Sequence, residues 1–190
     1  MKRRHAFAIA LVCVACSMPT VNSRPSVRAC LLDSSESVDD AEAYSAIFLL
    51  AHVALDEDAA THLVAAFRRA KDPLRKLALA YALDARLQFV EYRDAFVALY
   101  PTGRAQTAIW SMKADYVGVT SPLQTHLAQL ANNDDRALDK LVSGVPFADG
   151  SNAESLADKI QAISRHRPQA VKEALRRAGV SPARLGITIE

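Results

Sequence analysis

Apolar residues recur along most of this chain at intervals of three and four positions, which is the spacing of a helix with one buried face. The apolar stripes comprise Tyr44, Ile47, Phe48, Ala51 and Leu55; Leu74, Leu77, Ala78 and Tyr81; Leu123, Leu127 and Leu130; Leu156, Ile160 and Ile163; and Val171, Ala174, Leu175 and Ala178. Alternating runs typical of half-buried strands are nearly absent. The pattern therefore predicts an all-α fold.

Residues that start and stop helices separate these stripes. Predicted starts are Ser37, Asp56 or Asp58, Asp72-Pro73, Ser121-Pro122, Asp134, Ser151 with Glu154, and Pro168; predicted ends are near Leu55, Lys71, Tyr100 and Gly179, before a short turn at Ser181-Pro182. Short helices with short connections pack as antiparallel neighbours. We therefore expect about eight to ten helices in stacked antiparallel hairpins, as a short irregular α-solenoid or a helical bundle.

One predicted helix carries a family-like pattern. From Asp72 to Leu83 the sequence has an Asp, then a branched apolar residue and Arg, then Ala and Leu at helical spacing. This helix resembles the second helix of a HEAT-type repeat. HEAT proteins are stacked helical hairpins used as binding scaffolds, so the resemblance implies a scaffold fold. The other hairpins do not repeat the pattern, and their period of roughly 30 to 34 residues is shorter than the roughly 40 of HEAT repeats.

The N-terminus has the layout of a bacterial export signal. Met1 to His5 is basic, and Ala6 to Ala15 is an unbroken apolar run of ten residues. A ten-residue helix covers about half of the roughly 30 Å hydrocarbon core of a bilayer, so this run is too short for a permanent span. We therefore expect export, with residues 1–23 as the signal.

Two cleavage positions fit this signal. The residues on either side of Cys16 are small, which resembles a lipobox in which Cys16 accepts a lipid, although Cys13 stands where the family pattern has Leu. Alternatively, an ordinary signal peptidase would cut after Ser23, where the last three residues roughly fit the small-x-small rule. In a third interpretation, the apolar run is a buried N-terminal helix of the fold.

Composition divides the remainder of the chain. Residues 24–36 are rich in Ser, Pro, Arg and Asp and lack helical periodicity, which predicts a flexible tether. Residues 37–190 are enough for one hydrophobic core and too few for two comfortable ones, so we expect a single α-helical domain. Cys30 is the only cysteine beyond the signal, so no internal disulfide is expected there.

The charges give no reason to expect nucleic acid as a partner. The formal charge of +2 includes Lys2, Arg3 and Arg4 of the signal, so the remainder carries about −1. Residues 33–58 contain eight acidic residues and no Lys or Arg, whereas residues 159–184 contain seven Lys or Arg and a single acid. This polarity would steer an anionic partner to the C-terminal part, or the two stretches would attract each other.

The predicted fourth helix, residues 86–100, offers candidate binding residues. At 100° per residue its aromatic side chains fall on one stripe, formed by Phe89, Tyr92, Phe96 and Tyr100. Arg93 lies beside the stripe, where a guanidinium pairs with a carboxylate, stacks on a ring or extends to water. Two interpretations stay open: an aromatic-lined groove in which Arg93 reads an anionic ligand, or a buried central helix with one paired arginine.

Trp110, the only tryptophan, lies off the apolar stripe of its predicted helix and near Lys113. Exposed aromatic residues with basic neighbours are enriched at protein interfaces. An exposed Trp110 would therefore mark a partner surface, and partial burial at a helix junction is the alternative.

The sequence contains no recognisable catalytic or metal-binding motif. Its histidines beyond the signal are scattered singly, and only His52 and His62, with Asp56, could approach each other across a predicted hairpin. Glu91 and Asp94 could share a helix face, but nothing beside Glu91 predicts the desolvation that glycoside hydrolysis requires. No metal and no cofactor are therefore predicted, and an enzyme is the less favoured class.

These observations favour an exported, non-catalytic binding or scaffold protein of the bacterial cell envelope, placed in the periplasm and anchored by lipid if Cys16 is modified. Its partner would be a protein or another envelope component, and it would meet the membrane only through that anchor. The alternatives are an envelope enzyme with a dispersed site, such as a peptidoglycan-active hydrolase, and a carrier of a small apolar or anionic ligand held by the aromatic stripe.

Overall fold

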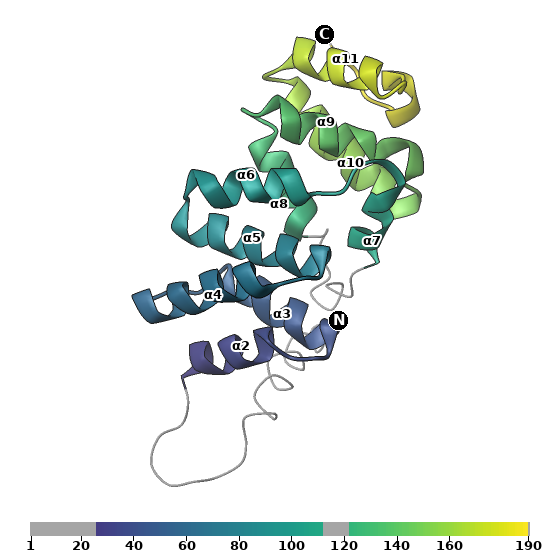
Figure 1. Ribbon diagram of the computed structural model, residues 1–190. Coiled ribbons are helices and arrows are strands. Elements are labelled where there is room, and N and C mark those ends of the chain that lie inside the picture. The colour runs from purple at the N-terminus through teal and green to yellow at the C-terminus, as the bar shows by residue number, and fades with distance from the viewer. Residues whose placement is uncertain (1–25, 112–121, 190) are drawn as a thin grey trace, which may run out of the picture. The chain divides into compact units, whose positions relative to one another are not determined.

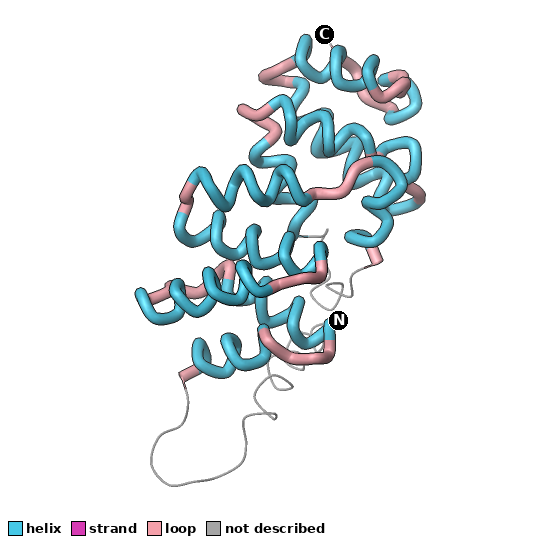
Figure 2. The backbone as a smooth tube through the Cα atoms, in the orientation of Figure 1, coloured by secondary structure: helices cyan, strands magenta, loops and turns pink. Residues whose placement is uncertain are grey.

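The computed structural model describes residues 26–111 and 122–189, and every regular element within these ranges is a helix. Figure 2 shows helices joined by short loops, with no strand in the described part of the chain. These residues form ten α-helices and three short 3₁₀-helices, and the α-helices pack in pairs. The predicted all-α fold is therefore confirmed.

The chain divides into two compact units, Met1–Arg93 (unit 1) and Asp94–Glu190 (unit 2), whereas the sequence predicted a single domain over residues 37–190. Chain length limits how large a core can be. Helical hairpins, however, bury their apolar faces against neighbours in the sequence and need no core shared by all of them. Length alone therefore does not predict one core.

Unit 1 contains α2 (Val27–Ser35), α3 (Asp40–Leu50), α4 (Glu57–Arg69) and α5 (Pro73–Leu87). Helix α3 packs against both α2 and α5, and α4 packs against α5 and α2, as Figure 1 shows. The core between them is filled by fully buried aliphatic side chains, including Ile47, Leu50, Leu63, Leu77 and Leu83. Burial of this apolar surface is the main force that holds the hairpins together.

Aspartates begin three of these helices. The carboxylates of Asp39, Asp56 and Asp72 accept hydrogen bonds from backbone N–H groups of the first turn. The predicted starts at Asp56 and Asp72 are confirmed. The start predicted at Ser37 is two residues early, because the Asp39 carboxylate accepts from two N–H groups, and α3 ends at Leu50 rather than near Leu55.

Residues 24–36 were predicted to form a flexible tether, but Val27–Ser35 form helix α2, so this prediction is wrong over these nine residues. The Ser26 hydroxyl accepts a hydrogen bond from the Ala29 N–H at 3.2 Å and caps the helix. Leu31 is buried, and α2 packs along α3. A nine-residue helix with one large buried side chain produces no readable periodicity, because tertiary contacts rather than amphipathicity stabilise it.

The helix predicted over residues 86–100 is interrupted near its start. Helix α5 continues to Leu87, and Gln88 then adopts a left-handed conformation with φ of 55° before α6 (Val90–Leu99) begins. A left-handed residue is a common helix stop, but glycine normally supplies it. The glutamine therefore gave no sequence signal, while the predicted end before Pro101 is confirmed.

Unit 2 contains the later elements, and the division between the units falls within α6. These elements are η1 (Gly103–Gln106), α7 (Thr107–Trp110), α8 (Pro122–Leu130), α9 (Asp135–Ser143), η3 (Val145–Phe147), α10 (Gly150–Ser164), α11 (Pro168–Arg177) and η4 (Pro182–Leu185). Helix α9 contacts α8, α10 and α11, and α10 also contacts α8 and α11 (Figure 1). Their buried side chains include Leu123, Leu127, Leu138, Leu141, Ile160 and Val171.

Most predicted helix boundaries in unit 2 are confirmed. Asp134 caps α9, Pro168 opens α11, and Gly179, with φ of 67°, follows the end of α11. The capping box predicted at Ser151 is absent from the structure, since the N-cap of α10 is Asp149, two residues earlier. Among the described residues, no helix has the length and apolar character that crossing a bilayer requires.

Candidate binding groove

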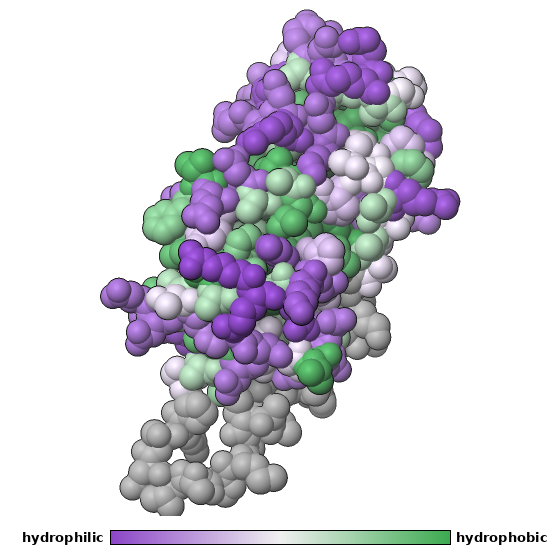
Figure 3. Space-filling view, viewed as in Figure 1, coloured by the Kyte–Doolittle hydropathy of each residue, from purple (hydrophilic) through white to green (hydrophobic). Residues whose placement is uncertain are grey.

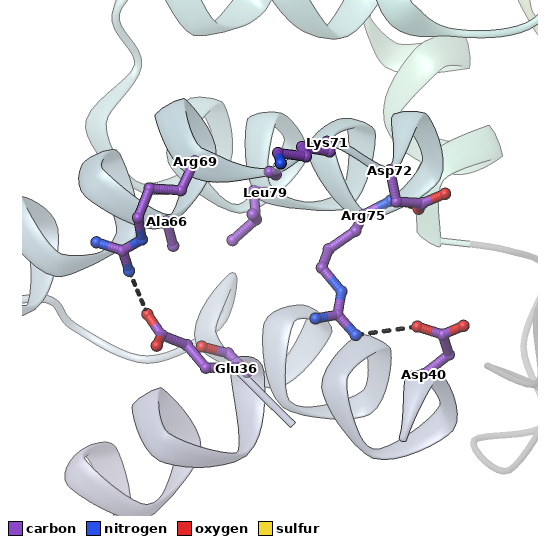
Figure 4. A pocket seen from close by; sticks show the side chains of 10 residues that line it. Glu36, Asp40, Ala66, Arg69, Lys71, Asp72, Arg75 and Leu79 are labelled. Carbon is purple, nitrogen blue, oxygen red and sulfur yellow. Dashed lines mark hydrogen bonds and ion pairs between the residues drawn. The ribbon is translucent and has the colours of Figure 1, made fainter. Parts of the chain in front are cut away.

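A groove of about 420 Å³ opens on unit 1 between the turn that joins α2 to α3 and the turn that joins α4 to α5. Side chains of both signs line it, three acidic and three basic: Glu36, Asp40 and Asp72, and Arg69, Lys71 and Arg75. In Figure 4, Arg69 and Arg75 extend across the opening toward Glu36 and Asp40. We call this feature the charged groove.

Two ion pairs cross the charged groove, Arg69 with Glu36 and Arg75 with Asp40. The Arg69 guanidinium lies 2.6 Å from a Glu36 carboxylate oxygen, and His62 Nε2 lies 3.1 Å from the same oxygen. The side chains of Arg69 and Glu36 are 61% and 45% exposed. An exposed ion pair contributes only about 0–1 kcal/mol. A ligand charge can therefore replace either partner at little cost to the fold.

Arg75 is held more firmly than Arg69. Its guanidinium donates to Asp40 and to the backbone carbonyl of Ser37, each at 2.9 Å, and its side chain is only 23% exposed. These contacts connect the start of α5 to the turn before α3. Arg75 therefore fixes the width of the groove, whereas Arg69 can leave Glu36 and pair with a charged group of a ligand.

Asp72 serves both the fold and the groove. Its carboxylate accepts from the Arg75 N–H at 2.7 Å, which caps α5, and from the hydroxyl of Tyr44 at 3.2 Å. Burial of Tyr44, together with the negative charges of Asp72 and Asp40, raises the pKa of the Tyr44 hydroxyl well above its ordinary value. Tyr44 is therefore a permanent hydrogen-bond donor that holds Asp72 in place.

The groove is mostly polar. Its apolar lining consists of Ala66, Ala70 and Leu79, and Lys71 stands at its edge as an exposed cation. Sites for small apolar ligands are lined predominantly by hydrophobic and aromatic side chains. The lining therefore suits an extended segment that carries charges of both signs better than a small apolar molecule.

The aromatic stripe of the predicted fourth helix lies mainly in the core. Tyr92, Phe96 and Tyr100 are at most 5% exposed, whereas Phe89 is 59% exposed. In unit 1 the rings of Phe89 and Tyr92 stack with centroids 6.4 Å apart, and in unit 2 those of Phe96 and Tyr100 meet edge to face at 5.8 Å. Ligand binding by this stripe stays a prediction.

Arg93 has the carboxylate partner that one interpretation of the sequence required. Its Nε lies 3.5 Å from Oδ1 of Asp84, which is 2% exposed on α5, while the Arg93 side chain remains 42% exposed. The buried carboxylate needs a nearby positive charge, because an isolated buried ion is costly. Arg93 therefore connects the first turn of α6 to α5, and a role in reading an anionic ligand stays a prediction.

The remaining predicted site residues are placed differently. Trp110 is half-buried in α7, and its indole N–H has no acceptor among the described residues. Lys113, its predicted neighbour, and Cys16, the predicted lipid acceptor, lie outside the described residues. A partner surface at Trp110 stays a prediction.

His62 meets Glu36 rather than a second histidine. His52 is exposed near the end of α3. Within residues 26–111 and 122–189, no group of three or more His, Cys, Asp or Glu side chains is arranged to hold a metal ion.

The charged groove was not predicted from the sequence. Its ion pairs join residues 33 and 35 positions apart, Arg69 with Glu36 and Arg75 with Asp40. The sequence shows the acidic run over residues 33–58, but it does not show which basic residues pair with these acids. The charged residues at the α2–α3 turn and the α4–α5 turn were the only sequence signal for this groove.

Comparisons of the chain with protein-family models, curated proteins and solved structures find no match.

Proposed function

We propose that this protein is an exported, non-catalytic binding scaffold of the bacterial cell envelope, and that the charged groove binds a polypeptide segment of a partner protein. The groove itself carries the proposal. It lies between two hairpin turns, its charged residues bear opposite signs, and one of its ion pairs is exposed enough to exchange with a ligand.

The geometry of the groove supports a polypeptide ligand. Arg69 and Glu36 offer one charge of each sign, so a bound segment with an acidic and a basic side chain could pair with both. Lys71 adds a further exposed cation at the rim. Because Arg75 and Asp40 hold the two turns together, the groove is formed before the ligand arrives, which lowers the entropy cost of binding.

Crosslinking from within the groove tests this proposal. A photoreactive benzoylphenylalanine placed at Lys71 should capture one partner polypeptide in living cells, whereas the same group at Arg104, an exposed position in unit 2, should not. Glu36→Arg, which reverses one wall charge, should abolish the Lys71 product. Equal capture from both positions, or capture unaffected by Glu36→Arg while the helical content is unchanged, would exclude the groove as the binding site.

Export is the second part of the proposal and rests on the basic and apolar N-terminal segments. Mass spectrometry of the protein recovered from cells distinguishes its two forms. A diacylglyceryl group on an N-terminal Cys16 would identify a lipoprotein, and an unmodified N-terminal Arg24 would identify a soluble periplasmic protein. A chain recovered from the cytoplasm with Met1 intact would contradict both.

A further inference from the structure

The C-terminal part of unit 2 concentrates positive charge. Residues 159–184 contain seven Lys or Arg. Three of these have side-chain partners that they hold with little exposure or across two helices: Lys159 donates to the Ser155 hydroxyl, Arg167 pairs with Asp135, and Arg177 pairs with Asp139. Of the other four, Arg176 has among the described residues only an exposed contact with Glu173 on its own helix, and Arg184 donates only to a backbone carbonyl.

The other four cations are exposed to solvent, and we call them the basic surface. Arg165 caps the end of α10, Lys172 and Arg176 lie one turn apart on α11, and Arg184 lies in η4. The single acid of this stretch, Glu173, contacts Arg176 at 3.4 Å, and both side chains are more than half exposed. Such a pair is weak. In Figure 3 the face over α11 is strongly hydrophilic.

An exposed aromatic ring adjoins this charge. The Arg184 guanidinium donates to the carbonyl of Pro146 at 3.3 Å, next to Phe147 in η3. Phe147 is 42% exposed and is the only large exposed hydrophobic residue among the described residues of unit 2. Helices that lie on membrane surfaces combine Lys and Arg side chains with exposed Trp, Phe or Leu side chains, and Arg184 with Phe147 is such a combination.

We infer that the basic surface binds the anionic headgroups of phospholipids. The cations stand on the outer face of a helix and its neighbouring turns, each on a long flexible side chain. A layer of headgroups presents phosphates at variable positions that such side chains can follow, and Phe147 can enter the interfacial region beside them. A folded acidic protein would instead need its carboxylates fixed at matching positions.

This inference uses no residue of the charged groove, so either proposal can fail alone. It adds a membrane contact that does not depend on a lipid at Cys16. Cations near an anionic membrane contribute additively to binding, and salt weakens their contribution.

Sedimentation with vesicles tests the inference on the full chain. Vesicles of phosphatidylglycerol and phosphatidylcholine should bind the protein in a salt-sensitive manner. Lys172→Gln with Arg176→Gln should weaken the salt-sensitive binding on the order of 30-fold. Binding to vesicles of phosphatidylcholine alone should not change. Inorganic phosphate at millimolar concentration should not compete, which separates headgroups in a bilayer from free phosphate.

A matched control removes the same charge elsewhere. Arg68→Gln with Arg104→Gln deletes two exposed cations that have no ion pair among the described residues, and it should retain most of the binding. Every variant keeps the same N-terminal residues, so their contribution cancels. Equal weakening by both double variants, or none by the first, would overturn the inference. Binding of polyglutamate without salt-sensitive binding of anionic vesicles would do the same and would favour an acidic protein.

Discussion

At Gly144 the packing of the folded structure and the conformational entropy of the unfolded chain predict opposite signs for the stability change on substitution by alanine. Gly144 caps the end of α9 with φ of −77° and ψ of −23°, a conformation that any residue adopts without strain. Gly→Ala at such a position usually stabilises a protein by about 0.4–1 kcal/mol, because alanine has less conformational freedom in the unfolded chain. In this fold, however, a Cβ at position 144 would lie 2.2 Å from Oε1 and 2.6 Å from Cδ of Gln106.

The cost of that clash depends on how freely Gln106 can move. Gln106 is fully buried in unit 2, and its Nε2 donates to the carbonyl of Lys140 at 2.5 Å and to the hydroxyl of Ser143 at 3.0 Å. Overpacking a core costs about 1–3 kcal/mol, and each hydrogen bond broken by a shift costs about 0.5–1.5 kcal/mol. After the gain from alanine is subtracted, Gly144→Ala should destabilise unit 2 by about 2 kcal/mol.

Urea unfolding followed by tryptophan fluorescence measures this directly, since Trp110 is the only tryptophan and lies in unit 2. In a Gln106→Ala background the obstructing amide is absent, so Gly144→Ala should become neutral or stabilising. The two substitutions should therefore show a coupling energy of about 2–3 kcal/mol. If Gly144→Ala stabilises the protein that retains Gln106, the packing argument is refuted.

Two further predictions concern helix caps. Hydrogen bonding from Arg136 lowers the pKa of Asp134, so the charged carboxylate stabilises the fold above its unfolded pKa of about 3.8, and this contribution is lost as the pH falls through the folded pKa. The stability difference between wild type and Asp134→Asn, measured by urea unfolding, should therefore be present at neutral pH and shrink as the pH falls below about 3.8. Asp72→Ala should destabilise unit 1 by about 2 kcal/mol, because it removes the cap of α5 and the acceptor of the Tyr44 hydroxyl. Asp72→Asn, which keeps an acceptor, should lose less stability. Thermal melts followed by circular dichroism measure both variants, and equal losses would contradict the capping explanation.

The sequence predicted helix starts where the signal is local. Asp56, Asp72 and Asp134 cap their helices as expected, because a cap depends on residues within one turn. The boundary at Gln88 and the short helix α2 were missed for a different reason. Gln88 adopts a conformation that glycine usually occupies, and α2 depends on contacts with α3. Tertiary packing determines both the boundary at Gln88 and the formation of α2, and a local sequence pattern does not predict tertiary packing.

The candidate site could be predicted only in part. The pairing of Arg93 with a carboxylate was one of the expected alternatives, and its partner Asp84 lies only nine positions earlier on the preceding helix. The charged groove was not predicted, because Arg75 and Asp40 lie 35 positions apart and meet only after two hairpins have packed. A sequence shows which residues carry charge but not which hairpin turns face each other.

Many arginines of this chain form ion pairs with carboxylates that lie far away in the sequence. Pairs of this kind join residues 28 to 42 positions apart, namely Arg28 with Asp56, Arg69 with Glu36, Arg75 with Asp40, Arg136 with Asp94, Arg167 with Asp135 and Arg177 with Asp139. Exposed pairs add little stability, but like charges brought together by a shifted register would be repelled. Helices with similar stripes of Leu and Ala can pack against each other in several registers. The ion pairs favour one of these registers, because only that register places opposite charges together. The cations of the basic surface form no ion pair with a carboxylate of another helix among the described residues, so this matching of charges does not explain their positions.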